Sequence, residues 1–282
     1  MTASDKSGRN LYISIGACLE NLVIASKFFG VYSHVKYHKN IKDDSVCEVY
    51  FNNLTGLIAK PNLRHKLLVK AILKRVTKRA FYHKRQVPKS IINALEKLSV
   101  HEHIKVNVLT TSEKLNQFTD ITIKAIQSGY SDRAFRKELS QWINNNLSDR
   151  KEGIPGYSLN MPFIVSLLFP FLLRNINLSE LVARINKKSL KTMSAVCIVT
   201  SATDTKRDWL EIGRISQRAL LILTSKDLST YITVAAVDID NYYLEVQELL
   251  NTSWRPQFSF TFGYSNIVSK FPPRHSVDEK LI

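Results

Sequence analysis

Arg75, Thr77 and Arg79 form the pattern in this sequence that best suits a chemical task. The pattern places two guanidinium groups and a hydroxyl group within one turn, near the end of a basic helix expected over residues 62–78. Guanidinium forks match the oxygens of a phosphate group, and each charge-assisted hydrogen bond contributes about 1.5–3 kcal/mol. The triplet therefore indicates a candidate site for a phosphate monoester.

The triplet lies in a strongly basic stretch. Residues 60–89 hold eleven Lys and Arg and no Asp or Glu, in a chain whose net charge is +16. Such a stretch attracts anions, whether nucleic acid, lipid or a phosphorylated cofactor, and the alternative is a solvated helix face on which Lys66, Lys70 and Lys74 recur. Nucleic acid is disfavoured because the stretch has no obvious aromatic stacking platform and no recognised DNA-reading motif.

The composition is that of a globular protein, with 44% apolar and 23% charged residues in 282, enough for one large domain or two of ordinary size. Cys18, Cys47 and Cys197 form no CxxC pair, which favours a reducing compartment. The first residues lack the apolar core of a secretory signal, and the longest apolar run, residues 161–173, is too short to span a bilayer. These features predict a cytoplasmic protein without a membrane partner.

Other patterns of reactive residues are weaker. His101 and His103 would point to one side of a strand, but no third ligand has a metal-like spacing, so we expect no metal site. Cys197 lies in an apolar strand and is expected to be a small core residue. The sequence has no GxSxG, P-loop or GxGxxG motif, which argues against common hydrolases, P-loop NTPases and Rossmann dehydrogenases.

The elements that must position the triplet include two similar stretches, residues 12–33 and 209–230. Tyr12 aligns with Trp209 and Gly16 with Gly213, and both stretches read as a helix followed by a short strand. A similarity at this distance indicates two related halves. The first helix, expected over 11–29, is apolar almost all round, which is typical of a buried or interface helix.

Hydrophobic periodicity and turn residues predict the remaining elements. We expect helices over 88–98, 111–129, 131–142 and 240–250, strands over 34–37, 46–51, 101–109, 192–201, 231–237 and 257–262, a loop over 147–163 and an extended C-terminal tail.

Four segments, in order, resemble the tandem, dormancy-associated branch of the nitroreductase-like FMN flavoproteins. They are KRVTKRAFYHKRQVP at 74–88, KEGIPGY at 151–157, DWLEIGRISQRALLILTSKDLST at 208–230, and RPQFSFTFGYSN with PPRHSVDE between 255 and 279. The resemblance implies an α+β fold with a central, mostly antiparallel sheet flanked by helices. It also implies two related halves, packed through long apolar helices.

The resemblance further implies roles for individual residues. Arg75, Thr77 and Arg79 would bind the FMN phosphate, Arg274 would approach the phosphate or the ribityl end from the tail, and the loop from Gly153 to Gly156 would cover the flavin. The implied activity is an FMN-dependent NAD(P)H oxidoreductase that reduces a nitroaromatic or quinone-like small-molecule acceptor by a ping-pong mechanism. A homodimer is a further expectation.

The chain also departs from the family pattern. The segment Pro-Ser-x-x-Asn-x-Gln-Pro-Trp is absent, and Asp227 stands where the family usually has glycine. We therefore expect a truncated first half over residues 1–60 and a near-complete second half over 61–282. The alternative function is a non-catalytic flavin-binding or flavin-sequestering protein, or a degenerate relative without a complete site.

Overall fold

The computed structural model describes residues 5–42, 45–52, 62–77, 79, 81–100, 102–266, 270–276 and 278–279. The boundary expected between residues 60 and 61 lies outside these ranges, as does His101.

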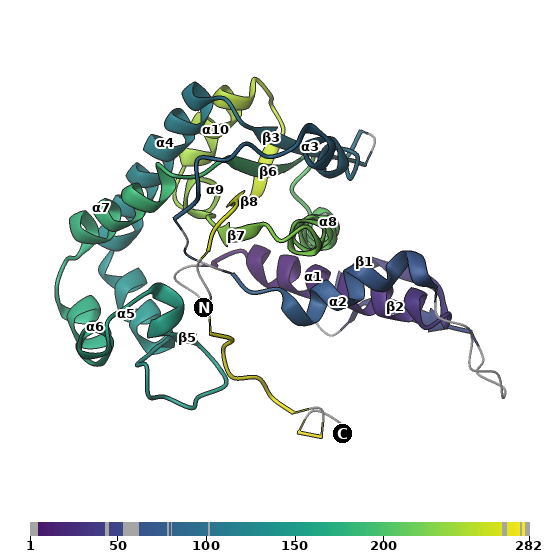
Figure 1. Ribbon diagram of the computed structural model, residues 1–282, viewed down its shortest axis with the longest axis horizontal. Helices are drawn as coiled ribbons and strands as arrows, with labels where there is room; N and C mark the ends of the chain where they lie inside the picture. Colours follow the sequence, from purple (N-terminus) through teal and green to yellow (C-terminus); the bar gives the residue numbers. More distant parts are fainter. Residues whose placement is uncertain are drawn as a thin grey trace.

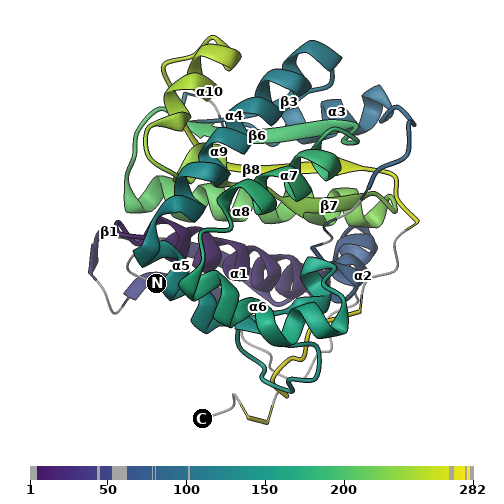
Figure 2. The ribbon, with the colours of Figure 1, turned by 90° about the vertical axis from the view of Figure 1, so that its left-hand side faces the viewer.

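A four-stranded antiparallel sheet forms the centre of the protein (Figure 2). Its strands are, in spatial order, β3 (Ile104–Leu109), β6 (Ala195–Ser201), β8 (Arg255–Gly263) and β7 (Ser229–Ile232). β6 is buried along its whole length, because both faces of the sheet are covered and alternate residues enter different cores. Ala195, Cys197 and Val199 join one hydrophobic cluster, whereas Val196 and Ile198 join the other.

Helices cover both faces of this sheet, as Figure 1 shows. α3 (Lys89–Glu96) and α8 (Lys206–Ser225) lie on one face. α4 (Ser112–Ser131), α9 (Ala235–Asp238) and α10 (Tyr242–Leu250) lie on the other, and α7 (Ser179–Leu190) packs against α4. The α+β class with a central antiparallel sheet is therefore confirmed.

A further layer lies outside α8. It consists of α1 (Arg9–Phe28), a hairpin of β1 (Tyr32–Lys42) and β2 (Ser45–Phe51), the short helix η1 (Leu63–His65) and α2 (Lys66–Lys74) (Figure 1). Tyr12 and Ile13 of α1 enter the same hydrophobic cluster as α8 and the sheet. α1 is also the one helix in the described ranges that is long and apolar enough to cross a membrane, and 44% of its most apolar stretch is buried.

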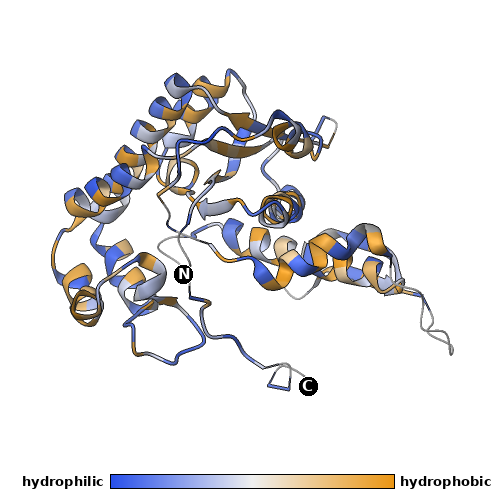
Figure 3. Ribbon diagram, viewed as in Figure 1, coloured by the Kyte–Doolittle hydropathy of each residue, from blue (hydrophilic) through white to orange (hydrophobic). Residues whose placement is uncertain are grey.

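A third group of elements connects α4 to α7. It contains α5 (Arg133–Trp142), β4 (Ile143–Asn144), β5 (Ile154–Pro155), η2 (Gly156–Leu159) and α6 (Phe163–Asn175). β5 and η2 lie within the segment expected to be a loop, and α6 contains most of the apolar run. Figure 3 shows α6 as a largely hydrophobic ribbon at the edge of the molecule.

The crossing of α1 and α8 is unusually close because glycine lies on both sides of it. A Cβ atom at Gly16 would overlap the carbonyl oxygen of Leu210, and a Cβ atom at Gly213 would overlap that of Ile13. The contacts are reciprocal, since Ile13 aligns with Leu210. Beside the glycines, the rings of Tyr12 and Trp209 lie 5.9 Å apart.

Polar contacts continue along the same crossing. Glu20 is 1% exposed, and its carboxylate accepts bonds from Nε of Arg214 at 3.0 Å and Nε of Arg218 at 2.6 Å. Gln217 donates to Asn21 at 2.8 Å. The buried carboxylate is thus compensated by two guanidinium groups, as a charge in a protein interior must be.

Equivalent positions of the two helix–strand units are separated by a constant 197 residues. Arg9 and Lys206 begin the helices, Phe28 and Ser225 end them, and Tyr32 and Ser229 begin the strands that follow. Gly30 and Asp227, also 197 residues apart, both adopt left-handed backbone, with φ of 73° and 57°. Asp227 thus has the conformation that favours glycine, which Asp tolerates better than most residues.

Several predicted boundaries were wrong. The helix expected over 62–78 ends at Lys74, because Arg75 is extended and Thr77 pairs with Thr230 beside β7. The strand expected over 231–237 ends at Ile232, and α9 follows. In the described residues the strand expected over 101–109 begins at Ile104, and His103 lies in a turn.

Gly213→Ala should destabilise the protein by about 1–3 kcal/mol, because the added methyl group must push two helix backbones apart. Urea unfolding followed by circular dichroism measures the change. Gly129→Ala on α4 is a matched control, since the nearest neighbour of its Cβ would be the flexible side chain of Ile239, at 3.2 Å, rather than a backbone. The control should remain within about 1 kcal/mol of the parent protein. Equal losses in both variants would contradict the importance of the helix crossing.

Candidate functional site

The site begins where α2 stops. Arg75 has ψ of 124°, so the chain is extended there, and alternate residues of an extended chain share a side. Nη1 of Arg75 donates to Oγ1 of Thr77 at 3.4 Å. The expected proximity of the guanidinium and hydroxyl groups is therefore present, but extended backbone produces it rather than a helical turn.

Arg274 brings a second positive charge to Arg75. Burial lowers the pKa of the Arg75 guanidinium, and the like charge of Arg274 lowers that pKa further. Neither side chain forms an ion pair with a carboxylate within the described ranges of the chain. Removing a guanidinium from water beside another positive charge is unfavourable unless an anion compensates it.

Arg79 has a different set of neighbours. Its Nε donates to the hydroxyl of Tyr231 at 3.0 Å, and its guanidinium carbon lies 5.3 Å from the centre of that ring. The Tyr231 hydroxyl donates in turn to Asn186 at 3.4 Å, and Asn160 donates to the carbonyl of Arg79 at 2.6 Å. Arg79 is thus positioned by β7, α7 and the end of η2.

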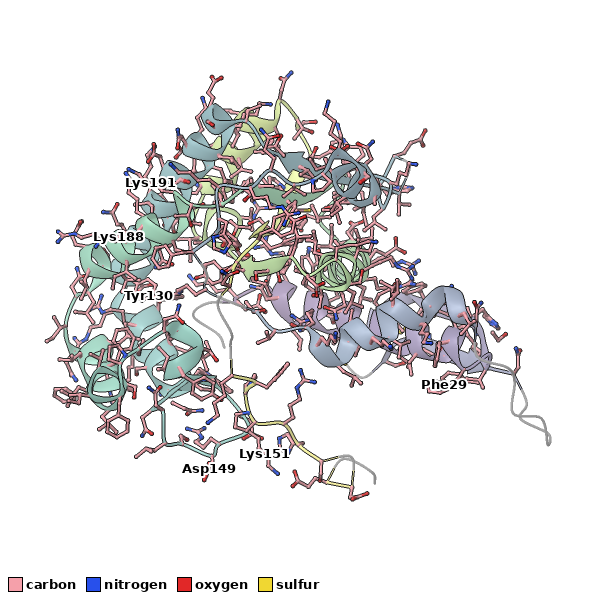
Figure 4. All side chains as sticks on the ribbon, viewed as in Figure 1. Phe29, Tyr130, Asp149, Lys151, Lys188 and Lys191 are labelled. Atoms are coloured by element: carbon pink, nitrogen blue, oxygen red, sulfur yellow. The ribbon has the colours of Figure 1, made fainter. Side chains whose placement is uncertain are left out.

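A largely apolar cavity of about 430 Å³ lies beside Tyr130, bounded by α1, α4, α5 and α9. Leu11, Phe135 and Leu139 are among its apolar walls, and the carboxylates of Asp5 and Asp238 also line it. Tyr130, marked in Figure 4, connects the cavity to the arginines: burial raises the pKa of its hydroxyl, and the charge of Arg79 partly opposes this effect. Arg75 and Arg274 do not line this cavity. Tyr130 thus relates the cavity to Arg79, whose charge acts on its hydroxyl.

Gly153 and Gly156 are required by close packing. Gly153 has φ of 97°, and a Cβ there would lie 2.5 Å from the carbonyl oxygen of Trp142. A Cβ at Gly156 would lie 2.6 Å from Oδ1 of Asn146. Both glycines let the loop fold back over β4 and the start of α6.

The same loop holds the C-terminal tail. The hydroxyl of Tyr157 donates to the carbonyl of Phe271 at 3.3 Å.

Ion pairs hold the tail to the loop as well. His275 lies between Glu152, at 2.8 Å, and Glu279, at 2.9 Å, and Lys151 pairs with Glu279. Hydrogen bonds from Lys151 and His275 lower the pKa of Glu279 to about 2. Asp149 and Lys151, marked in Figure 4, lie on the loop at its approach to the tail.

The structure thus joins Arg75 to Thr77, with Arg274 near enough for its charge to lower the pKa of Arg75, and places Arg79 next along the chain. The loop of Gly153 and Gly156 contacts the tail that carries Arg274. Sequence reasoning missed Tyr130, Tyr231, Asn160 and Asn186, which are far from the triplet in sequence and belong to no motif used to find it.

The described residues do not gather the other candidates, the histidines and Cys197, into a site. His103 is exposed, and the described residues contain no group of three or more potential metal ligands among His, Cys, Asp and Glu. Cys197 is fully buried, and burial raises the pKa of its thiol, which disfavours the nucleophilic thiolate.

No protein-family model matches the sequence, and no curated protein matches it. Solved structures do resemble it. The FMN-dependent nitroreductase NfnB from Mycobacterium smegmatis, solved in complex with NADPH, is 15% identical, with a TM-score of 0.51 over 78% of this chain and 99% of that chain. The FMN and NADPH-dependent nitroreductase NfnB from sphigopyxis sp. strain HMH is 14% identical, with a TM-score of 0.50 over 76% of this chain and 97% of that chain. The chain therefore has the nitroreductase fold.

Proposed function

We propose that this protein binds FMN and acts as an NAD(P)H-dependent oxidoreductase of the nitroreductase-like type. The observation that carries the proposal is the bond from Arg75 to Thr77 on an extended segment, where the charge of Arg274 also lowers the pKa of Arg75 and no described carboxylate pairs with either arginine. The nitroreductase fold supports the choice of FMN, because two similar structures of this fold are described as FMN-dependent nitroreductases.

The donor set fits a phosphate group. Arg75 and Arg274 supply guanidinium forks, and Thr77 supplies a hydroxyl that already bonds to Arg75. A phosphate dianion would offset the repulsion between the two guanidinium groups and restore the hydrogen bonds that Arg75 loses on burial. Arg79 would add charge from the direction of β7, where Tyr231 holds its side chain.

The cavity beside Tyr130 fits the other end of the ligand. Its apolar walls would exclude water from a flat ring system, whereas the arginines would hold the phosphate outside it. Tyr130 and Arg79 lie at the junction of these two parts. An amphipathic ligand with one anionic end satisfies both parts at once.

When bound, FMN would supply the redox chemistry by which NAD(P)H would reduce a nitroaromatic or quinone-like acceptor in a ping-pong cycle. The residues of this chain would bind and orient the cofactor, exclude water and keep positive charge close to it. This scheme assigns no acid or base to a side chain.

The two helix–strand units support a proposal about organisation. We infer that α1 with β1, and α8 with β7, are corresponding parts of two related halves. The 197-residue spacing and the reciprocal glycine contacts favour this origin. A homodimer could add further walls to the site, and the three free cysteines favour a reducing, cytoplasmic setting.

A non-catalytic flavin-binding protein is the second candidate. It is favoured by one observation, that Arg75 and Arg274 lie outside the cavity at Tyr130. Anaerobic addition of NADH or NADPH to the FMN-loaded protein decides between the two functions. Bleaching of the flavin absorbance supports the oxidoreductase, whereas a stable yellow protein supports storage or sequestration.

Arg75→Ala and Arg274→Ala should each weaken FMN binding at least about tenfold, since each removes a charge-assisted bond to the phosphate. Arg79→Ala should weaken binding as well, because it removes charge near the same ligand. Fluorescence titration of the apoprotein with FMN measures the affinities.

Lys66→Ala is the control for this series, because Lys66 is an exposed cation of α2 and its removal should change the affinity less than twofold. Equal effects of Lys66→Ala and Arg75→Ala would show that general charge, rather than a built site, attracts the flavin. A protein that takes up no FMN at all contradicts the proposed function.

FMN affinity should rise as the pH increases from about 5 to 7, because the second ionisation of a phosphate monoester lies near pH 6. A guanidinium group does not change its charge in this range, so the pH dependence belongs to the phosphate of the ligand. Riboflavin, which lacks the phosphate, should bind more weakly and show no such dependence. A pH-independent FMN affinity, or equal affinities for the two flavins, would contradict phosphate recognition by the arginines.

A further inference from the structure

α6 exposes an apolar surface that no element in the described ranges covers. Ile164, Leu168 and Phe171 are 70%, 55% and 67% exposed, and Val165 and Leu167 are exposed as well. We call these five residues the α6 face. Ser166 and Leu173 are the buried residues of the helix, and they attach it to the rest of the protein.

The α6 face is more than a scatter of single exposed residues. From Phe163 to Leu173 the helix has no charged side chain, and the polar Ser166 points inward, where its hydroxyl accepts a bond from the backbone of Asn146 at 3.0 Å. A contiguous apolar surface of this kind marks a contact with a partner or a membrane.

Positive charge surrounds the helix. Residues 133–191 contain ten Lys and Arg and four Asp and Glu. Arg133 and Lys137 of α5 and Arg174 of α6 line one shallow hollow beside the C-terminal end of the helix, with Asp132 as the carboxylate at its edge. On α7, Lys188 and Lys191, both marked in Figure 4, are exposed toward the same side of the molecule as α6.

We propose that the α6 face lies on an anionic lipid membrane, with the helix parallel to the surface. Apolar side chains beside Lys and Arg are the combination that peripheral proteins use, because the former enter the acyl boundary and the latter contact acidic headgroups. The 13 residues of α6 extend only about 20 Å, too short to cross a hydrocarbon core of roughly 30 Å. This binding mode agrees with the expectation that this apolar run does not span a bilayer, but it departs from the expectation of a protein without a membrane partner.

Charge complementarity selects the lipid over a second copy of the chain. A twofold contact through the α6 face would bring the same basic surroundings of two copies together, and like charges in an interface are unfavourable. The face also offers a protein partner no polar side chain between Phe163 and Leu173, since Ser166 is buried. An anionic lipid surface satisfies both the apolar and the basic part.

The test is co-sedimentation of the full-length chain with vesicles of phosphatidylcholine, with and without phosphatidylglycerol. The chain should bind the anionic vesicles, bind neutral ones at least about tenfold more weakly, and dissociate at high salt. Leu168→Glu and Phe171→Glu should each reduce binding at least about tenfold, because each places a carboxylate in the acyl boundary.

Leu244→Glu is the matched control, because Leu244 is an exposed leucine of α10, away from the α6 face. It should retain vesicle binding, and circular dichroism should show the same helix content in all variants. Lack of binding to anionic vesicles overturns the proposal, and so does equal loss in the Leu244→Glu control. A lipid-free dimer that Phe171→Glu dissociates, seen by analytical ultracentrifugation, also overturns it, because the face would then belong to a second copy.

Discussion

The close approach of α1 and α8 is the constraint on which the rest of the structure depends. At Gly16 and Gly213 each helix touches the other's backbone, so neither position tolerates a side chain. This contact holds α1 in the sheet's own hydrophobic cluster and fixes the start of α1 at the cavity beside Tyr130. α2, which packs against both helices, is placed by the same contact, and so is Arg75 at its end.

Glu20 and Arg75 are both charged side chains that lose hydration on folding, but their neighbours differ in the sign of the charge. Glu20 loses its hydration and gains two arginines from the facing helix. Arg75 loses much of its hydration and gains a neighbour of the same sign. A folded chain keeps such an arrangement most easily where a ligand of opposite charge completes it. Among the described residues Arg75 has no carboxylate partner, and this distinguishes it from Arg214 and Arg218, which pair with Glu20.

Much of the fold could be predicted from the sequence, because a regular spacing of apolar residues over a long segment indicates its secondary structure. The helix expected over 11–29 is observed as Arg9–Phe28, and the fold class is confirmed. Residue pairing across the chain was harder to predict: Thr77 leaves the helical pattern because it meets Thr230, which lies 153 positions later. The contacts of Arg79 with Tyr231 and Asn160 likewise depend on tertiary packing, and the apolar run at 161–173 showed no amphipathic period that would place its faces.

The placement of Arg274 on a tail held by surface contacts has a thermodynamic consequence. Tyr157, Glu152 and Lys151 hold the tail through one hydrogen bond and exposed ion pairs, each of which is weak in water. An anion that needs Arg274 then binds with an apparent affinity scaled by the fraction of molecules whose tail is docked. If the tail is docked in half of the molecules, the apparent affinity falls only by about a factor of two. If it is docked in about 1% of them, the apparent affinity falls about a hundredfold. Ionic strength, through contacts remote from the arginines, thereby becomes a control on how well the site holds its ligand.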